Sequence, residues 1–247
     1  MNNLITITTD FGDAFAAAQL KAVILAFGFT GQIIENHSVT KYSITEGAFQ
    51  IRTLVKYCPK NSIHVGVVDP GVGSKRRGLI IKTRQSYFIG PDNGVLYPAA
   101  DDAGIEKVWK INEYYFGEIS RTFHGRDVFV KCAAHIAKDK KPEDFGCVEV
   151  NKISICRLKF KYGQVLHVDD YGNIKVHFPK EFNKNKTLSI SKNGKKVVFP
   201  LVKTFSDVNP GNPLAYKGSS NTLELAVNLG DAAKSFNIKN EEILAIE

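Results

Sequence analysis

Two apolar, strand-like runs near the start of the chain each end in an aspartate that is followed within two residues by glycine. The first ends at Asp10 in ITITTDFG and the second at Asp69 in VGVVDPGVG. In open α/β sheets, ligands bind beyond the carboxyl ends of the strands, and glycine-bearing turns let the backbone approach a ligand closely. Ordinary tight turns also explain either motif alone. We expect both carboxylates to lie along one edge of a sheet, as candidates for a ligand site.

A third polar group lies in the segment FHGRD, directly before the apolar run VFVKCAAHIA. Asp127 suits the first turn of a helix, where the helix dipole stabilises a carboxylate. Arg126 and Asp127 can form a structural ion pair. His124 lies just outside the expected helix start and is freer to face a cleft. A histidine accompanied by two carboxylates and an arginine is a candidate for proton transfer.

The remaining motifs favour neither phosphate-loop nor metal chemistry. DPGVGS matches neither the dinucleotide-binding glycine pattern nor the P-loop pattern. The turn GPDNG, residues 90–94, fits a tight turn and a ligand-binding role equally well. The sequence has no His-x-x-x-His motif, and His135 is expected on the buried side of its helix. None of the four cysteines forms a CxxC pair, so we expect reduced, mostly buried thiols and no metal site.

The elements that must position these residues alternate between strands and helices in the first 150 residues. Strands are predicted at 4–9, 31–36 and 62–69, helices at 14–27, 44–58 and 125–138, and an antiparallel pair in GLIIKT and SYFIG. This alternation predicts an N-terminal α/β domain with a largely parallel sheet over residues 1–157. Residues 158–247 contain short β-like runs joined by Gly, Asn and Pro turns, a hairpin at SKNGK, and one helix near 229–236. They predict a smaller, β-rich, barrel-like domain.

Composition limits the classes of function. The chain has 247 residues, of which 43% are hydrophobic and 23% charged, as in ordinary globular proteins. No apolar run approaches the roughly 20 residues that span a bilayer, and the N-terminus does not resemble a signal peptide. We therefore expect a cytoplasmic protein without membrane contact. The net charge is +8, but the lysines are scattered and no aromatic-basic RNA motif accompanies them, so nucleic acid is not an expected partner.

The motifs DFG, VVDPGVGSKRR, GPDNGVL, TFHGRD and VDDYGN occur in this order. Together they resemble the S-adenosyl-L-methionine (SAM) hydroxide adenosyltransferase family, adenosine-forming SAM hydrolases that are related to fluorinase and chlorinase. The resemblance runs from TTDFG to SSNTLELAVN, nearly the whole chain. It implies hydrolysis of SAM to adenosine and L-methionine by attack of activated water on the ribose C5′. It also implies a homotrimer with SAM between the N-terminal domain of one subunit and the C-terminal domain of its neighbour. No cofactor is implied, since SAM is the substrate.

In this family an Asp–Arg–His set activates water. The resemblance places the set on Asp69, Arg76 and His124, with Arg77 as an alternative to its neighbour. The chemistry suits these residue types, because bulk water, with a pKa of about 15.7, must lose a proton to attack carbon. Asp69 and His124 can accept or relay that proton, while a permanently charged guanidinium stabilises the emerging hydroxide. The sequence leaves open which of the two takes the proton.

The resemblance also implies contacts with the substrate. They are Asp10 for the ribose hydroxyls, Tyr42 beside the adenosine, Asp169, Tyr171 and Asn173 for the methionine part, and Phe205 and Ser219 for adenine and methionine. The chain departs from the family pattern in DAFAAAQLKA near Asp13, in DDYGNIKVHF around Val176, and at Ser220, where the relatives carry arginine. These departures bear on substrate affinity and leave the reaction centre intact.

Two alternatives accompany the hydrolase interpretation. The first is a SAM-dependent halogenase. The halogenating relatives lack this combination of Asp-Pro-Gly and His, and they carry an insertion where this chain runs directly through GLIIKTRQSYFIGPDNG. Both differences favour hydroxide over halide. The second is a non-catalytic SAM or adenosine sensor on the same scaffold, for which an intact Asp–Arg–His set would serve no purpose.

Overall fold

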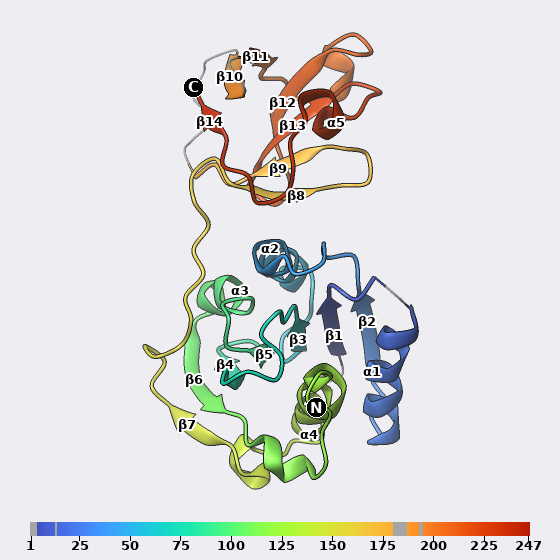
Figure 1. Ribbon diagram of the computed structural model, residues 1–247, viewed down its shortest axis with the longest axis vertical. Helices are drawn as coiled ribbons and strands as arrows, with labels where there is room; N and C mark the ends of the chain where they lie inside the picture. Colours follow the sequence, from blue (N-terminus) through green and yellow to red (C-terminus); the bar gives the residue numbers. More distant parts are fainter. Residues whose placement is uncertain (1–3, 13, 180–186, 193–194) are drawn as a thin grey trace. The chain divides into compact units, whose positions relative to one another are not determined.

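The structure is a computed structural model that describes residues 4–12, 14–179, 187–192 and 195–247. The chain divides into two compact units, Met1–Leu158 and Lys159–Glu247 (Figure 1). This division falls one residue after the boundary expected from composition. Among the described residues, no helix is long and apolar enough to cross a membrane.

A seven-stranded sheet forms the centre of the first unit, in the order β2-β1-β3-β5-β4-β6-β7. The strands are β1 (Leu4–Thr9), β2 (Gln32–Asn36), β3 (Ile63–Val67), β4 (Gly78–Thr83), β5 (Tyr87–Pro91), β6 (Ile105–Lys110) and β7 (Val148–Val150). β1 runs parallel to β2 and β3, and β3 runs parallel to β5. β4 is antiparallel to both of its neighbours, β5 and β6. The predicted α/β class and the antiparallel GLIIKT–SYFIG pair are confirmed.

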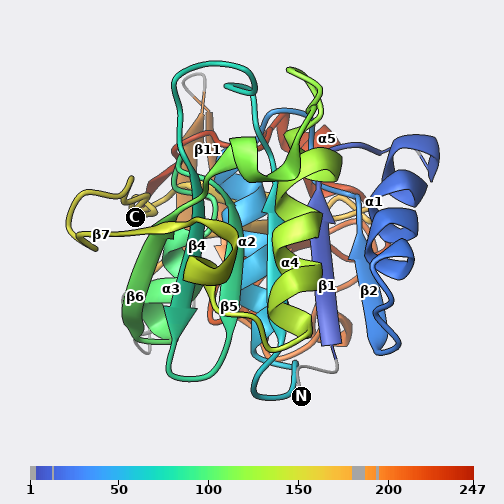
Figure 2. The same cartoon turned by 90° about the horizontal axis from the view of Figure 1, so that it is seen from below.

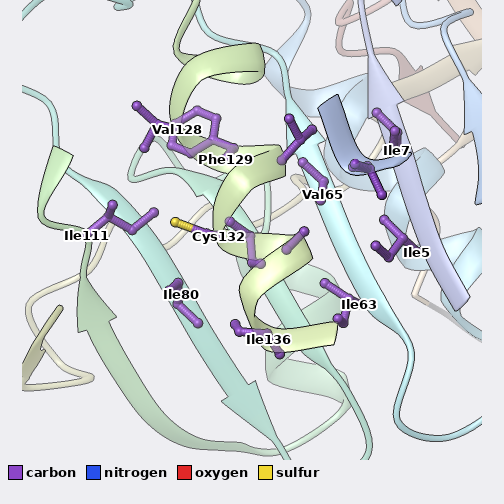
Figure 3. Packing of buried hydrophobic residues seen from close by; sticks show 14 of the residues in the cluster. Ile5, Ile7, Ile63, Val65, Ile80, Ile111, Val128, Phe129, Cys132 and Ile136 are labelled. Carbon is purple, nitrogen blue, oxygen red and sulfur yellow. The ribbon is translucent and has the colours of Figure 1, made fainter. Parts of the chain in front are cut away.

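Helices cover both faces of this sheet. They are α1 (Ala14–Ala26), α2 (Ile44–Val55), α3 (Tyr97–Asp102) and α4 (Val130–Ala137), the last preceded by a π-helical turn, Gly125–Phe129. Strand β4 shows the alternation: Ile80 packs in one core cluster with α1 and α4, whereas Leu79 and Ile81 pack in the other with α2 and α3. Figure 2 shows α4 and α2 on opposite sides of the strands. Figure 3 shows Cys132 and Ile136 of α4 facing the apolar side chains of the sheet.

The second unit is β-rich. It contains β8 (Val165–Val168), β9 (Ile174–Val176), β10 (Thr187–Lys192), β11 (Lys195–Pro200), β12 (Pro213–Lys217), β13 (Leu223–Val227), α5 (Ala232–Phe236) and β14 (Ala245–Ile246). β10 and β11 pair antiparallel, which confirms the predicted hairpin; its turn, residues 193–194, lies outside the described residues. The helix begins after Asp231, whose side chain accepts a hydrogen bond from Lys234 N, and is shorter than predicted.

The β-rich character expected for this unit is confirmed, but its described strands form two linked sheets and no closed barrel. They make a four-stranded sheet, β12-β13-β9-β8, and a three-stranded sheet, β11-β10-β14. Isolated bridges join the two sheets at two places, from Leu201, just after β11, to Ala215 of β12, and from Gln164, just before β8, to Ile243, just before β14. These bridges link the described sheets without a continuous ladder of paired strands around a closed barrel.

The four cysteines are all free, but only Cys132 and Cys147 are buried, so the expectation of mostly buried thiols holds for half of them. Burial raises the pKa of Cys147 to about 11, which keeps that thiol protonated and unreactive at neutral pH.

Candidate active site

The two strand-end aspartates lie at one edge of the sheet. β1 and β3 are adjacent and parallel, with Thr9 opposite Val67, and Asp10 and Asp69 follow directly beyond this pair. Both carboxylates line a cavity of about 270 Å³. The other lining residues are Phe11, Lys41, Tyr42, Val67, Val72, Thr122, Phe123, His124 and Gly125. The chain thus brings the carboxyl end of the sheet and the FHGRD segment to one hollow.

Asp69, Arg76 and His124 are in direct contact beside this cavity. Arg76 donates from Nε to both oxygens of Asp69, at 3.1 and 3.0 Å, and from Nη2 to Oδ2 at 2.6 Å. Nη2 also lies 2.9 Å from Nδ1 of His124. The side chains of Asp69 and Arg76 are only 5% and 10% exposed, and that of His124 is 7% exposed. Because a guanidinium only donates hydrogen bonds, Nδ1 of His124 is the acceptor in this contact.

Glycine at position 73 allows the segments DPGVG and TFHGRD to approach each other. Gly73 has φ +76°, and a Cβ atom there would stand 2.6 Å from the backbone oxygen of Arg121. Any side chain would therefore push the DPGVG loop away from the segment that carries His124. Inside the loop, Val72 N donates to Asp69 O and Arg76 N donates to the Ser74 hydroxyl. These bonds fix the backbone on both sides of the Asp69–Arg76 pair.

Arg126 and Asp127 form the ion pair expected from the sequence, at 2.7 Å between Nε and Oδ1. Asp127 also accepts the backbone N–H of Ser120 at 2.8 Å. Burial alone would raise the pKa of Asp127, but the hydrogen bonds from Arg126 and Ser120 outweigh it, and the pKa is lowered. The pair therefore closes the loop from Ser120 to Asp127 and holds His124 at the cavity.

The choice between the neighbouring arginines is resolved by their partners. Arg77 forms an ion pair with Asp92 and donates to the backbone oxygen of Ser154, so it is turned away from Asp69. In the same GPDNG turn, Asn93 donates to the Val68 backbone oxygen at 2.8 Å. This turn therefore supports the end of β3, which agrees with its structural interpretation.

One residue of the cluster was absent from the sequence prediction. Oε1 of Glu113 lies 3.5 Å from Nη1 of Arg76 and 3.5 Å from Nδ1 of His124. Glu113 opens the 3₁₀ turn Glu113–Phe116, in a stretch without glycine or any motif that the argument from sequence used. Tertiary packing positions Glu113. In the sequence, its presence in the cluster could have been suspected only because it is a carboxylate shortly before TFHGRD.

Asp10 and Tyr42 are linked by a backbone contact. Oδ2 of Asp10 accepts the N–H of Tyr42 at 2.7 Å, and Tyr42 has φ +67°. The next residue, Ser43, caps α2 by accepting the N–H of Glu46. Held between these two contacts, the ring of Tyr42 is 71% exposed at the rim of the cavity.

The residues expected from the second unit lie in two places. Tyr171, Asn173 and Phe205 line a separate cavity of about 690 Å³, together with Asp170 and residues 227–231. Asp169 lies behind them: it accepts the N–H groups of Tyr171 and Asn173 at 3.1 and 2.9 Å. Burial opposes ionisation, but the hydrogen bonds from Asn173, followed by the charge of Lys175 and the N–H of Tyr171, lower the pKa of Asp169.

Ser219 is the member of the predicted set that the structure does not bring to this cavity. It is exposed in the turn between β12 and β13, where Gly218 N donates to Thr222 O. The cavity is lined from Val227 onward, at the opposite end of β13. Among the described residues of the second unit, Ser219 therefore makes no common site with Tyr171 and Phe205.

Comparison with known proteins agrees with this arrangement. Residues 5–146 match the SAM hydroxide adenosyltransferase N-terminal domain and residues 163–244 match the C-terminal domain of the same family. The chain belongs to the SAM hydroxide adenosyltransferase family. It is 31% identical to a protein of Methanocaldococcus jannaschii named (R)-S-adenosyl-L-methionine hydrolase, with 96% of this chain and 92% of the relative covered. The protein of the same name from Salinispora tropica is 33% identical, with 93% and 92% covered.

Solved structures and a halogenating relative complete the comparison. A crystal structure of an uncharacterized conserved protein from Thermotoga maritima has a TM-score of 0.89 and 29% identity, and covers 98% of this chain and all of its own. A fluorinase of Actinoplanes sp. is 22% identical over 96% of this chain and 95% of its own. The chain is thus more similar in sequence to these two hydrolases than to this fluorinase.

Two of the departures from the SAM hydroxide adenosyltransferase pattern lie in the second unit. Val176 is buried in β9 opposite Leu223, and Ser220 lies in the β12–β13 turn. Asp13 is outside the described residues. Among the residues that are described, no group of three or more His, Cys, Asp or Glu side chains is arranged to hold a metal ion.

Proposed function

We propose that this protein hydrolyses SAM to adenosine and L-methionine, without a cofactor. The observation that carries the proposal is that Arg76 binds both Asp69 and His124, whose side chains line one cavity with Asp10 and Tyr42. Family membership and the names of the hydrolase relatives support it.

Asp69 takes the proton from water in this proposal. Nδ1 of His124 accepts a hydrogen bond from Arg76, so a neutral imidazole carries its proton on Nε2. His124 then donates from Nε2 to the oxygen of the attacking water, while a carboxylate oxygen of Asp69 accepts a proton of the same water. Arg76 holds both partners and stabilises the negative charge that develops on oxygen.

The substrate supplies its own leaving group. The water oxygen forms a bond to the ribose C5′, the C5′–S bond breaks, and its electron pair goes to sulfur, which turns the sulfonium into the neutral thioether of methionine. Holding the water in line with that bond removes much of the entropic cost of the reaction. The exposed ring of Tyr42 at the cavity rim can favour the cationic substrate by about 0.5–2 kcal/mol.

Substrate binding involves both units in this proposal. Asp10 and Tyr42 contact the adenosine part, and Asp169, Tyr171, Asn173 and Phe205 contribute contacts from the second unit, whereas Ser219 lies away from their cavity. Asp10 and Asp169 act partly through the backbone groups that they hold. The assembly is the homotrimer implied by the family resemblance, which light scattering of the purified protein would test by its mass.

The test is product analysis with the full chain. Purified protein and SAM in ¹⁸O-labelled water should give adenosine labelled at the 5′-hydroxyl, plus methionine, at a rate that a metal chelator does not change. Halogenated nucleoside formed in the presence of chloride or fluoride would instead identify a halogenase. Tight SAM binding without any product would identify a sensor.

Substitutions then test the roles within the cluster. Asp69→Asn and His124→Ala should each lower kcat by about a hundredfold or more while SAM affinity changes little, because both groups act on water and not on the bound substrate. Thr122→Ser, at the same cavity but outside the cluster, is the control and should remain close to wild type. Near-normal turnover in both cluster variants would refute the assignment.

A further inference from the structure

We propose that Glu113 is a positioning residue of the reaction centre, which supplies the negative charge that lets the Asp69–Arg76–His124 cluster take up the proton released in each turnover. This inference rests on the proposed function. Its geometric basis is the pair of 3.5 Å contacts from Oε1 of Glu113, one to Nη1 of Arg76 and one to Nδ1 of His124.

Glu113 faces the only part of the guanidinium that its other partners leave free. Nε and Nη2 of Arg76 are occupied by Asp69 and His124. Nη1 is buried and, among the described residues, finds no hydrogen-bond acceptor within normal geometry. The Glu113 carboxylate at 3.5 Å is its counter-charge. Arg76 thus has one carboxylate at its Nε and Nη2 donors and a second near Nη1, and this restricts its rotation away from Asp69.

The charge of the cluster depends on Glu113. With a neutral imidazole, Asp69 and Arg76 cancel, and Glu113 leaves a net charge of −1 for the four side chains. That charge matches the sulfonium of SAM, which carries +1. Hydrolysis converts SAM and water to neutral adenosine and methionine plus one proton. If the cluster keeps that proton briefly, the four side chains together become neutral. Without the charge of Glu113 the cluster would carry +1 in this state, which the permanently charged guanidinium disfavours.

Glu113 also connects the cluster to water on a second side. It lines a cavity of about 370 Å³ that includes Arg76 but neither Asp69 nor His124. Its side chain is 27% exposed, far more than that of Arg76. A substrate that fills the first cavity leaves this second one open. A proton held by the cluster therefore has an exit past Glu113 that does not require the substrate or product to leave.

The local fold fixes Glu113 in this position. The 3₁₀ turn that it opens ends at Phe116, which packs on the main core and stacks with His135. The charged groups that line the same cavity are Lys75, Arg76 and Arg77 from the loop before β4 and Lys110 from β6. Arg77 is already paired with Asp92. With Asp69 and His124 on the other side of Arg76, these are the groups that influence protonation here.

The experiment compares Glu113→Gln, Glu113→Asp and the control Glu118→Gln in the full-length protein. Glu118 is an exposed carboxylate in the same segment. We measure kcat and KM for SAM from pH 5 to 9, with thermal unfolding of each variant. Glu113→Gln should lower kcat by about tenfold or more with KM changed less than about threefold, and should move the pH limb that reports cluster protonation to lower pH. Glu113→Asp, which keeps the charge, should retain the wild-type limb, and Glu118→Gln should match wild type throughout.

Two results overturn the inference. One is a Glu113→Gln variant with wild-type kcat and an unchanged pH profile. The other is a loss of kcat that parallels a loss of thermal stability, while the pH profile stays unchanged in both Glu113→Gln and Glu113→Asp. That outcome would show that Glu113 has a purely structural role. A wild-type protein that releases no adenosine would instead contradict the proposed function, so the two failures are distinguishable.

Discussion

Replacing Arg76 by lysine tests the central geometric claim, because it keeps the charge and removes the forked arrangement of donors. Arg76 makes three hydrogen bonds to Asp69 and one to His124, using two of its nitrogens. A lysine ammonium has three donors on one nitrogen at the end of a flexible chain, so it does not reproduce the planar fork that binds Asp69 through Nε and Nη2 while also reaching His124. We expect Asp69 and His124 to lose their fixed relative position.

The magnitude follows from the bonds that are lost. Hydrogen bonds with a charged partner contribute about 1.5–3 kcal/mol each, and the variant loses about two of them in a buried place where water screens little. If about half of that loss is felt only in the transition state, the barrier rises by roughly 1.5–3 kcal/mol. At about 1.4 kcal/mol per factor of ten, kcat falls about ten- to a hundredfold.

The assay is adenosine release at saturating SAM, followed by chromatography, with SAM affinity measured separately by calorimetry. Arg77→Lys is the matched control, because Arg77 pairs with Asp92 and Ser154 and should affect stability more than turnover. Guanidinium ion added to Arg76→Ala should restore part of the rate. An Arg76→Lys enzyme within about threefold of wild type, or a control that loses as much, would refute the reasoning.

Two further predictions concern residues outside the reaction centre. Burial lowers the pKa of His64 from 6.5 to about 4. As the pH falls, His64 is protonated in the unfolded chain before it is protonated in the folded protein. The neutral, buried His64 therefore contributes about 3 kcal/mol to the free energy of unfolding above pH 6.5, and this contribution is lost as the pH falls towards 4. Denaturant unfolding at pH 7.5 and 4.5 should show a smaller pH difference in His64→Gln, and an equal difference contradicts this. Buried Glu224 pairs with Lys175 at 3.0 Å and accepts the Tyr216 hydroxyl at 2.7 Å, and Tyr216 packs on Phe205 of the second cavity. Glu224→Gln should lower the melting temperature and raise KM for SAM several-fold with a smaller change in kcat, and a wild-type KM would disprove the link.

Much of the first unit was predictable because its signals are local. The runs LITITT and IHVGV, rich in β-branched residues, predict the buried strands β1 and β3, and the amphipathic pattern after Ser43 predicts α2. The six-residue helix α3 and the strands β6 and β7 were not predicted. β6 depends on pairing with β4, and β7 on pairing with β6 across about 40 residues of chain. Such pairing is a tertiary effect that overrides weak local preference.

The site divides in the same way. Asp10 and Asp69 could be placed at one sheet edge from topology alone, since parallel neighbouring strands end on the same side. Arg76 came only from the family resemblance, and Glu113 from neither source. Their contacts join positions 37 and 48 residues apart in sequence, from Arg76 to Glu113 and to His124. No periodicity of apolar residues carries information about a contact between two loops.

The two adjacent arginines show how a small backbone feature decides a chemical role. The family resemblance favoured Arg76, but residue type alone does not distinguish it from Arg77, which has the same charge and lies next to it just before β4. In extended chain, successive side chains point to opposite sides. Arg76 consequently meets Asp69, His124 and Glu113, whereas Arg77 meets Asp92 at the GPDNG turn. A shift of this segment by one residue would exchange the positions of the two arginines. Arg77 would then face Asp69 and His124, and Arg76 would face Asp92. The short bond from Asp92 N to Arg77 O, at 2.8 Å, extends the β4–β5 ladder to this point and so fixes the register on which the reaction centre depends.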